Sequence, residues 1–422
     1  MGRLLNARHA AGGARAALAL ACLWSTLSTS PARALQSDFD ASIDLRAVSV
    51  SSPTSFLYGG GGTLRYDGSH DGLQLGSVRL AWRGDFTDTL RLTAESVAYG
   101  DHDAHALDLT ELVLSWRPVP RSAWRSELKV GAFDPPISLE HRMRGWRSPY
   151  TLSASALNTW VGEELRTIGV EYDGDWLRQG SGHGWNLGVT GALYGWNDSA
   201  GVVMGKRGWA MHDRQTTLFG KLGTPGAGII DGRTLFYRDL DGKPGYYGGL
   251  TANWRGELDL RALHYDNRAD PYTFAPAIND GGWHTVFDSF GARWSPDEHW
   301  TLIAQQLRGT TEFGRLAPAA GPENYWDFDA SFLLASWQNG AERFSARYDD
   351  FAMRQTVSWF FGFYNRDAGH ALTAAWFHTL GPRVTLIAEW LELHDTLAAR
   401  ALIAEPLGAT ERQLQLGLRV EL

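Results

Sequence analysis

Apolar and polar side chains alternate along most of this chain. The last ten residues show it most cleanly, because Leu414, Leu416 and Leu418 alternate with Gln413, Gln415 and the polar residues that follow. A period of two predicts a β-strand with one apolar and one polar face. The same alternation predicts strands at residues 38–50, 77–83, 90–95, 111–117, 126–133, 165–172, 185–196, 246–254, 258–265, 286–294, 300–307, 327–337, 343–351, 371–378, 384–391 and 413–422.

The connections between these strands alternate in length. Short ones lie at residues 84–89, 255–256, 295–299, 339–340 and 381–382, and long ones at 51–71, 134–164, 266–284, 309–324, 352–367 and 394–412. Short turns at one rim and long loops at the other are typical of outer-membrane β-barrels. This sorting predicts an even strand number with both termini at the short-turn rim, whereas a soluble sandwich has no reason to sort its loops.

We therefore predict an all-β fold, a transmembrane antiparallel β-barrel of about 16 strands that forms a single domain over residues 35–422. Residues 216–222 and 234–239 could add two strands and make 18, but both ranges are short for membrane strands and lie next to Gly and Pro breakers, which favours 16. No stretch approaches the roughly 20 apolar residues of a membrane helix, so a closed barrel is the remaining way to cross a bilayer. The 19 Trp and 14 Tyr residues suit aromatic girdles at two membrane interfaces.

In a barrel of this size the lumen holds water, so the polar face of each strand is expected to point inward. This rule selects as candidate pore-wall residues Arg79, Arg83, Arg91, Glu95, Glu111, Arg117, Lys129, Arg343, Arg347 and Glu389. It also points Asp329 into the lumen. Such charges either create a transverse field that filters solutes or pair with each other and only solvate the wall.

Residues 134–164 break the series of strands. Pro135, Pro136 and Pro149 lack the N–H groups that a strand would need, and a connection of this length is usually functional or disordered. We predict that this loop folds into the barrel and narrows it, the alternative being an ordinary surface loop. The candidate constriction residues share a position in this loop and a formal charge: Arg142, Arg144, Arg147, Glu163 and Glu164.

The N-terminus has the pattern of a secretory signal peptide over residues 1–34, with early arginines, an apolar run and an Ala-Arg-Ala cleavage site. Cys22 is the only cysteine, so a mature chain has no disulfide or thiolate metal site. Because residues 1–34 contain four arginines and no acids, their removal moves the formal charge from −8 to −12. A chain so acidic is not expected to bind nucleic acid.

Three segments resemble bacterial outer-membrane porins, in particular the phosphate-selective porin superfamily. They are residues 131–140 (GAFDPPISLE), 146–150 (WRSPY) and 162–169 (GEELRTIG). The resemblance implies a homotrimer, passive diffusion and a constriction formed by an inward loop. The chain departs from the family in ending at Leu422 rather than at an aromatic residue, and its lysines are scattered, so phosphate selectivity is not carried over.

The expected function is that of a porin in the bacterial outer membrane, in contact with lipid and allowing passive diffusion of small hydrophilic solutes. The arginines of residues 142–147 favour anionic solutes. No catalytic motif, cofactor-binding motif or metal site stands out, and we expect no enzymatic activity. The alternatives are an outer-membrane barrel enzyme of lipase or protease type, and a structural or adhesive barrel, which would have a plugged lumen.

Overall fold

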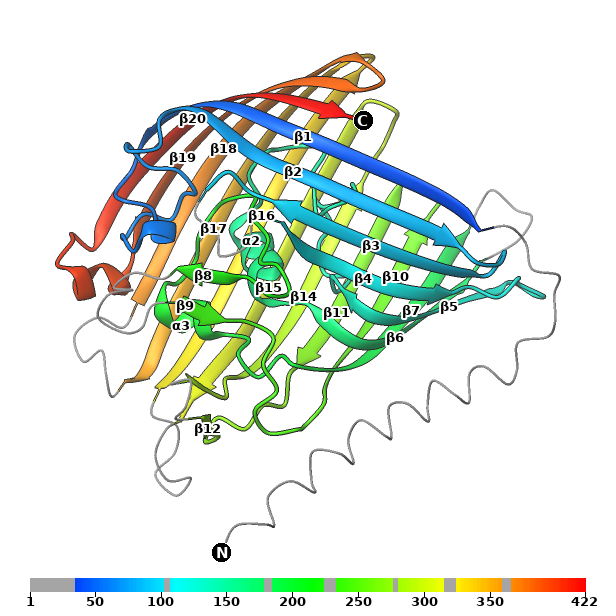
Figure 1. Cartoon of the computed structure of the whole chain (residues 1–422), viewed down its shortest axis with the longest axis horizontal. Coiled ribbons are helices and arrows are strands. Elements are labelled where there is room, and N and C mark those ends of the chain that lie inside the picture. Colours follow the sequence, from blue (N-terminus) through cyan, green and yellow to red (C-terminus); the bar gives the residue numbers. More distant parts are fainter. Residues whose placement is uncertain are drawn as a thin grey trace, which may run out of the picture.

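The computed structural model describes residues 35–101, 107–177, 184–223, 233–275, 280–314, 324–358 and 366–422. Its main feature is a closed antiparallel barrel of 16 strands (Figure 1). The barrel strands are β1 (Gln36–Ser51), β2 (Gly72–Asp85), β3 (Leu90–Ala98), β4 (Asp108–Trp116), β5 (Trp124–Phe133), β6 (Thr167–Trp176), β7 (Trp185–Gly195), β10 (Gly245–Trp254), β11 (Leu258–Asp266), β14 (His284–Trp294), β15 (Trp300–Phe313), β16 (Asn324–Asn339), β17 (Glu342–Ser358), β18 (Arg366–Gly381), β19 (Val384–Thr396) and β20 (Gly408–Glu421). The predicted signal peptide, residues 1–34, lies outside the described residues.

Each strand pairs with the next strand of the barrel, and β1 closes the ring by pairing with β20. In that closing pair Ile43 lies opposite Val420 and Ser42 opposite Glu421, so the start of β1 and the end of β20 both lie at the short-turn rim. Closure leaves no unpaired sheet edge, the arrangement that a membrane demands. The sorting of the connections into short turns and long loops therefore predicted the topology correctly.

The preferred count of 16 is confirmed. Two short strands do form in the ambiguous region, β8 (Lys221–Gly223) and β9 (Arg233–Leu235), but they pair only with each other. A similar small ribbon joins β12 (Phe274–Ala275) to β13 (Asp280–Gly281). Both ribbons belong to the long connections rather than to the barrel wall.

Tryptophans mark the short-turn rim on the outside of the barrel. Trp124 lies opposite Trp176, Trp185 opposite Trp254, and the series continues around the rim. Trp116, Trp124, Trp176, Trp185, Trp294 and Trp300 are all exposed large side chains. An outward ring of indoles at one level is the expected aromatic girdle of a membrane interface.

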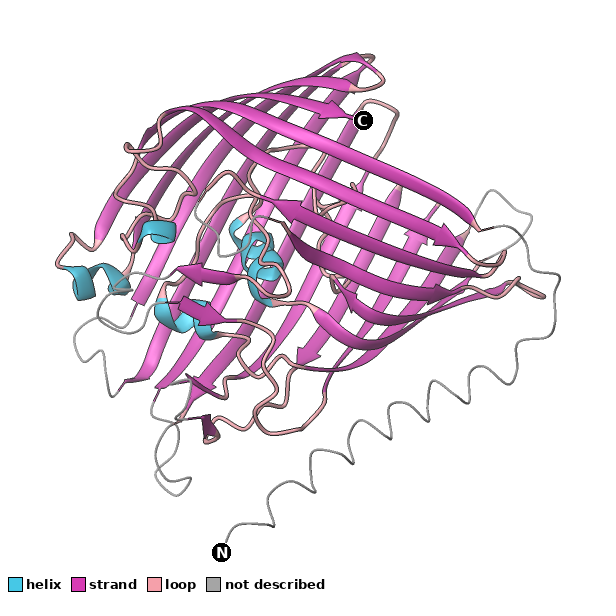
Figure 2. Ribbon diagram, viewed as in Figure 1, coloured by secondary structure: helices cyan, strands magenta, loops and turns pink. Residues whose placement is uncertain are grey.

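The long-loop half of the barrel is filled by its own loops (Figure 2). Helix α2 (Ala156–Glu164) contacts the inner faces of β16 and β17 and also touches α3 (Val202–Lys206), and two short 3-10 turns, η1 (Phe56–Tyr58) and η3 (Ala398–Ile403), lie in other long connections. Apolar side chains of these loops join inward residues of the wall in one buried cluster. In the described part of the chain, no helix is both long and apolar enough to cross a membrane.

The filled half of the lumen is an exception to the expectation that the polar face of each strand points inward. Phe328 and Ala330 of β16 point inward and are 1% exposed, and Asp329 between them points outward and is exposed. The prediction that Asp329 faces the lumen was wrong. At this level the wall meets packed loops instead of water, so the apolar face of β16 is the inner one.

Candidate functional site

A charged cavity of about 700 Å³ opens toward the short-turn rim, and we call it the vestibule. It lies between the inner faces of β2 to β5 and the first part of the loop that follows β5. Among the described residues, seven basic and six acidic side chains line it. The vestibule is therefore polar, nearly charge-balanced and wide enough for a small solute.

The predicted wall residues divide between this vestibule and other parts of the lumen. Those that line the vestibule are Arg83, Arg91, Glu95, Glu111, Arg117 and Lys129. Many of its charges are paired across strands: Lys129 Nζ lies 2.6 Å from Glu171 Oε1, and Arg91 Nε lies 2.6 Å from Asp85 Oδ1. Arg79 borders a neighbouring cavity of about 420 Å³. On the opposite wall, Arg343 stacks over the Tyr150 ring at 5.2 Å.

The three candidate constriction arginines lie together at the inner border of the vestibule and the adjoining cavity. Each faces an acid of the wall: Arg142 Nη1 is 3.4 Å from Asp259 Oδ2, and Arg147 Nη1 is 2.7 Å from Glu421 Oε1. Arg144 pairs with Asp40. The side chains of Arg142 and Arg144 remain 42% and 37% exposed, so they still face solvent in the lumen. The acidic partners on the wall reduce the net positive field of the three arginines.

Local sequence explains how the loop turns beneath the vestibule. The His141 and Trp146 rings stack with centroids 4.5 Å apart, and Gly145 and Trp146 both adopt left-handed backbone angles, with φ of 69° and 53°. That region suits glycine and is strained for tryptophan, so the ring stack holds Trp146 there. The turn presents Arg142 and Arg144 toward the lumen.

Ser138, His141 and Glu140 form the grouping closest to a hydrolytic triad that we find in this turn, but its geometry is wrong. Ser138 Oγ lies 2.9 Å from His141 Nδ1, and Glu140 Oε1 approaches the same nitrogen at 4.0 Å. A triad needs the acid and the nucleophile on different ring nitrogens. Burial also lowers the pKa of His141 to about 4, too low for a general base at neutral pH.

Beyond the turn, the loop enters the barrel as helix α2. Ser155 begins it, since its side chain accepts a hydrogen bond from Asn158 N. Trp160 lies at the helix centre, 1% exposed, with edge-on ring contacts to Phe328 at 5.2 Å and Phe287 at 5.5 Å. A hydroxyl cap before an apolar run was a sequence signal for this helix, but we predicted the whole segment to be a loop.

Glu163 and Glu164, the acidic constriction candidates, lie within the packed interior and not on the vestibule. Glu163 bonds Arg207 Nη1 and Nη2 at 2.7 Å and His212 Nε2 at 2.8 Å. Burial alone would raise the pKa of Glu163, but Arg207 and His212 outweigh it and hold this pKa at about 2. Both partners come from the connection between β7 and β10, in which we predicted no functional residue.

The carboxylate of Glu164 joins α2 to α3. It accepts hydrogen bonds from the backbone N–H groups of Gly201 at 3.0 Å and Val203 at 2.7 Å. All residues in 150–167 and nearly all in 197–217 are buried. We call these two segments together the plug, because they pack the described part of the lumen beyond the vestibule.

Charged wall residues fasten the plug. Arg347 donates to Glu140 at 3.1 Å and to the carbonyl oxygens of Ser153 at 2.8 Å and Ala154 at 2.9 Å. Glu389, on the neighbouring inner wall, accepts the N–H of Ser153 at 3.0 Å. Arg347 and Glu389 are each 1% exposed, so in this conformation they bind the plug rather than a solute.

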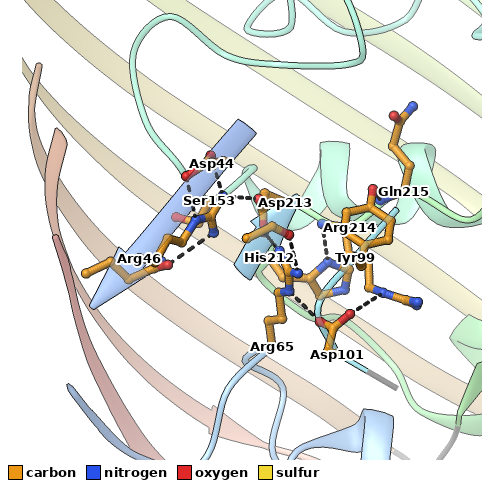
Figure 3. Close-up of polar contacts among 12 residues, drawn as sticks. Asp44, Arg46, Arg65, Tyr99, Asp101, Ser153, His212, Asp213, Arg214 and Gln215 are labelled. Carbon is orange, nitrogen blue, oxygen red and sulfur yellow. Dashed lines mark hydrogen bonds and ion pairs between the residues drawn. The ribbon is translucent and has the colours of Figure 1, made fainter. Parts of the chain in front are cut away.

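A second network ties the plug to β1 and to the connection between β1 and β2 (Figure 3). Asp213 of the plug lies between Arg46 of β1, with Oδ2 at 2.5 Å from Nη2, and Arg65, with Oδ1 at 3.0 Å from Nη1. Arg65 also pairs with Asp101 at 2.5 Å. The two arginines outweigh the effect of burial and hold the pKa of Asp213 well below its usual range. Sequence reasoning missed this network, whose members lie far apart along the chain.

Three carboxylates whose spacing could hold a metal ion come from Asp198, Asp239 and Asp241, with ligand atoms within 4.8 Å of one another in the part of the chain that the structure describes. Asp198 Oδ2 already accepts the N–H of Asp241 at 3.2 Å. Lys243 Nζ lies 3.5 Å from Asp241. These contacts brace a loop, and Lys243 offsets part of the carboxylate charge that a cation would need.

No protein-family model and no curated protein sequence matches the chain. Solved structures do. OmpTdeltaL8, an outer membrane protein of Vibrio cholerae, is 10% identical and has a TM-score of 0.54, covering 92% of this chain and 100% of its own. The outer membrane channel DcaP of Acinetobacter baumannii is 10% identical with a TM-score of 0.55, covering 92% of this chain and 97% of its own. An anion-selective porin from Comamonas acidovorans is 14% identical with a TM-score of 0.50, covering 92% of this chain and 100% of its own. These likenesses show that the chain has the fold of an outer-membrane porin.

Proposed function

We propose that this protein is a passive channel for small hydrophilic solutes in a bacterial outer membrane. The observation that carries the proposal is the vestibule, a polar cavity of about 700 Å³ within the barrel and open toward the short-turn rim. A barrel that only anchored loops would need no solvated, charged interior. Two of the similar structures are described as a channel and as an anion-selective porin, which supports the same function.

The charge arrangement favours a weak preference for anions over cations. Arg142 and Arg144 are the partly exposed charges at the inner border of the vestibule, and each is paired with an acidic residue of the wall. Paired surface charges retain only a fraction of their Coulomb energy in water. We therefore propose anionic or zwitterionic solutes, without selectivity for phosphate.

The plug makes a structural barrel the second candidate. Residues 150–167 are all buried, and a continuous pore through this level would leave some of them exposed. For a channel, the plug must therefore shift to open a path to the long-loop rim. A structural barrel would keep the plug closed.

Single-channel recording in planar bilayers separates the two candidates. We expect discrete conductance steps and a reversal potential that favours anions; neutralising all three loop arginines in Arg142→Ala/Arg144→Ala/Arg147→Ala should shift that potential toward cations. Arg255→Ala, in a short turn, is the control. Absence of steps at every voltage would favour the structural barrel, and cation preference in the unmodified protein would contradict the proposed solute class.

Export and assembly belong to the same proposal. We propose that residues 1–34 are removed as a signal peptide and that the barrel assembles as a homotrimer. The outward faces of β4, β6 and β7 support an apolar contact, with exposed side chains of Leu112, Leu114, Val170, Leu187 and Leu193. N-terminal sequencing of the mature protein and its mass in detergent test the two statements.

A further inference from the structure

The connection between β1 and β2, residues 52–71, is folded into the barrel instead of lying over its rim. Residues 60–67 are all buried, and the side chain of Phe56 is 0% exposed. The apolar side chains of this connection belong to the same buried cluster as those of α2 and α3. We call residues 52–71 the lid, because they contact the plug from the long-loop end of the barrel.

One buried carboxylate of the wall holds the lid. Glu411 of β20 is 0% exposed and accepts hydrogen bonds from Thr63 N at 3.0 Å, Thr63 Oγ1 at 2.9 Å and Leu64 N at 3.3 Å. Arg400 of η3 lies 3.0 Å from Glu411 through Nη2, and its Nε donates to Gly61 O at 2.9 Å. Hydrogen bonds to a charged group are stronger than neutral ones, and loss of the acceptor leaves buried donors unsatisfied. Glu411 therefore fastens the lid to the wall.

Glycines let the lid approach its neighbours closely. At Gly61 a Cβ would lie 2.7 Å from Arg400 Cγ, and at Gly62 it would lie 2.5 Å from Pro53 O. A side chain at either position would push the lid away from η3 or open its own turn. The run of four glycines at residues 59–62 is therefore part of how the lid is seated.

The lid also binds residues 207–213 of the plug. Thr63 O accepts the N–H of Met211 at 3.2 Å, and Leu64 forms a β-bridge with Met211. Arg65 of the lid pairs with Asp213 of the plug at 3.0 Å (Figure 3). Thr63 thus contacts the wall through its N–H and hydroxyl and the plug through its carbonyl oxygen.

A ring of the lid reaches the ion pairs that join the two segments of the plug. The Phe56 ring stacks on the His212 ring with centroids 5.1 Å apart, and the Arg207 guanidinium lies 4.5 Å from the Phe56 centroid. Arg207 and His212 are the two partners of Glu163 in α2. Contacts therefore run without a break from the wall through the lid to α2.

We propose that the lid is an autoinhibitory segment, so that the plug moves only after residues 52–71 have separated from residues 207–213. Displacing the plug under a seated lid breaks the Thr63–Met211 hydrogen bond, the Arg65–Asp213 ion pair and the Phe56–His212 stack together. Loss of buried polar partners is costly, and here several are lost in one step. The conductance readout of this inference rests on the proposed channel function, whereas the contact of lid and plug is measured without conduction.

A reversible cross-link tests the order of the two movements. Leu64→Cys/Met211→Cys places two thiols on a β-bridge, where the Cα separation lies within disulfide range, and residues 35–422 contain no other cysteine. In planar bilayers we expect the oxidised variant to lose at least about tenfold in open probability, and dithiothreitol to restore it. Met211→Cys alone under the same oxidant is the control. Unchanged openings with the disulfide formed, as counted by mass spectrometry, would show that lid and plug move as one unit and would overturn the proposal.

Hydrogen exchange measures the same contact without conduction. Glu411→Ala removes the acceptor of Thr63 and Leu64, so residues 55–67 and 207–213 should both exchange at least about tenfold faster. The matched control is Glu392→Ala, a carboxylate on the outer face of β19 that pairs with Arg412, and it should change neither segment. Continued protection of β14 to β17 shows that the barrel stays folded.

Faster exchange of residues 55–67 in Glu411→Ala with unchanged exchange of residues 207–213 would show that the plug holds itself in place, which contradicts an autoinhibitory lid. Absence of conductance steps in the unmodified protein would count against the channel. In that case the exchange of residues 207–213 still decides whether the lid holds the plug.

Discussion

Replacing Trp160 by alanine tests whether the plug is held in the barrel by its packing. The indole is 1% exposed and lies at the centre of α2, in contact with Phe287, Phe328 and Trp209 at ring-centroid distances of 5.5, 5.2 and 6.1 Å. Two of these partners belong to the barrel wall and the third to the other segment of the plug. Removing the indole therefore weakens the packing of α2 against the wall and against the other plug segment at once.

The expected loss follows from the buried volume that disappears. A fully buried Trp→Ala change costs about 3–5 kcal/mol, because the cavity left behind collapses only partly. If the contacts of Trp160 are lost when the plug moves, the displaced population rises by about a hundredfold to several thousandfold, at tenfold per 1.4 kcal/mol. The wall strands keep their ladder of backbone hydrogen bonds, so the barrel itself remains folded.

Planar-bilayer recording together with hydrogen exchange measures this shift. We expect Trp160→Ala to open more often or with larger steps than the unmodified protein, and residues 150–167 to exchange faster while β15 and β16 stay protected. The matched control is Trp300→Ala, which removes an outward indole that is 44% exposed. Unchanged exchange in residues 150–167 would refute the packing argument, and faster exchange without any change in conductance would separate the plug from the pore.

Three further perturbations follow from the structure. Asp213→Asn leaves Arg46 and Arg65 short of a counter-charge and should lower the free energy of unfolding by about 3 kcal/mol, measured as a lower thermal midpoint in detergent. Adding Arg65→Met should recover part of this loss, and no recovery would contradict direct pairing. Burial lowers the pKa of His141 in the folded protein from 6.5 to about 4. The stability that its turn gains from neutral His141 is therefore complete above about pH 6.5 and is lost as the pH falls toward 4. Hydrogen exchange of this turn at about pH 7 and about pH 4.5 should show the loss, and the same acid response in His141→Phe would contradict it. Gly131→Ala places a Cβ 2.1 Å from a carbonyl oxygen of the neighbouring strand at a φ of 142°, and it should lower the thermal midpoint, whereas an unchanged midpoint would show that the strand pair relaxes easily.

The barrel could be predicted from sequence because its signals are local. A residue such as Leu416 faces outward because its neighbours alternate with it, and each short turn forces the next strand to run back beside the last. The strand number and the sorting of the loops follow from such short-range patterns. The prolines marked residues 134–164 as a loop, but its inward course was a prediction that only the packed interior confirmed.

The interior of the barrel was decided by tertiary contacts. Trp160 and Phe328, or Glu163 and Arg207, are partners that no spacing along the chain reveals, and they determine which lumen residues are buried and which remain in the vestibule. The same contacts explain Asp329: beside Trp160 the inner face of β16 is apolar, so its polar face lies outside. Alternation determines that a strand has two faces, but only what packs against each face determines which one is wet.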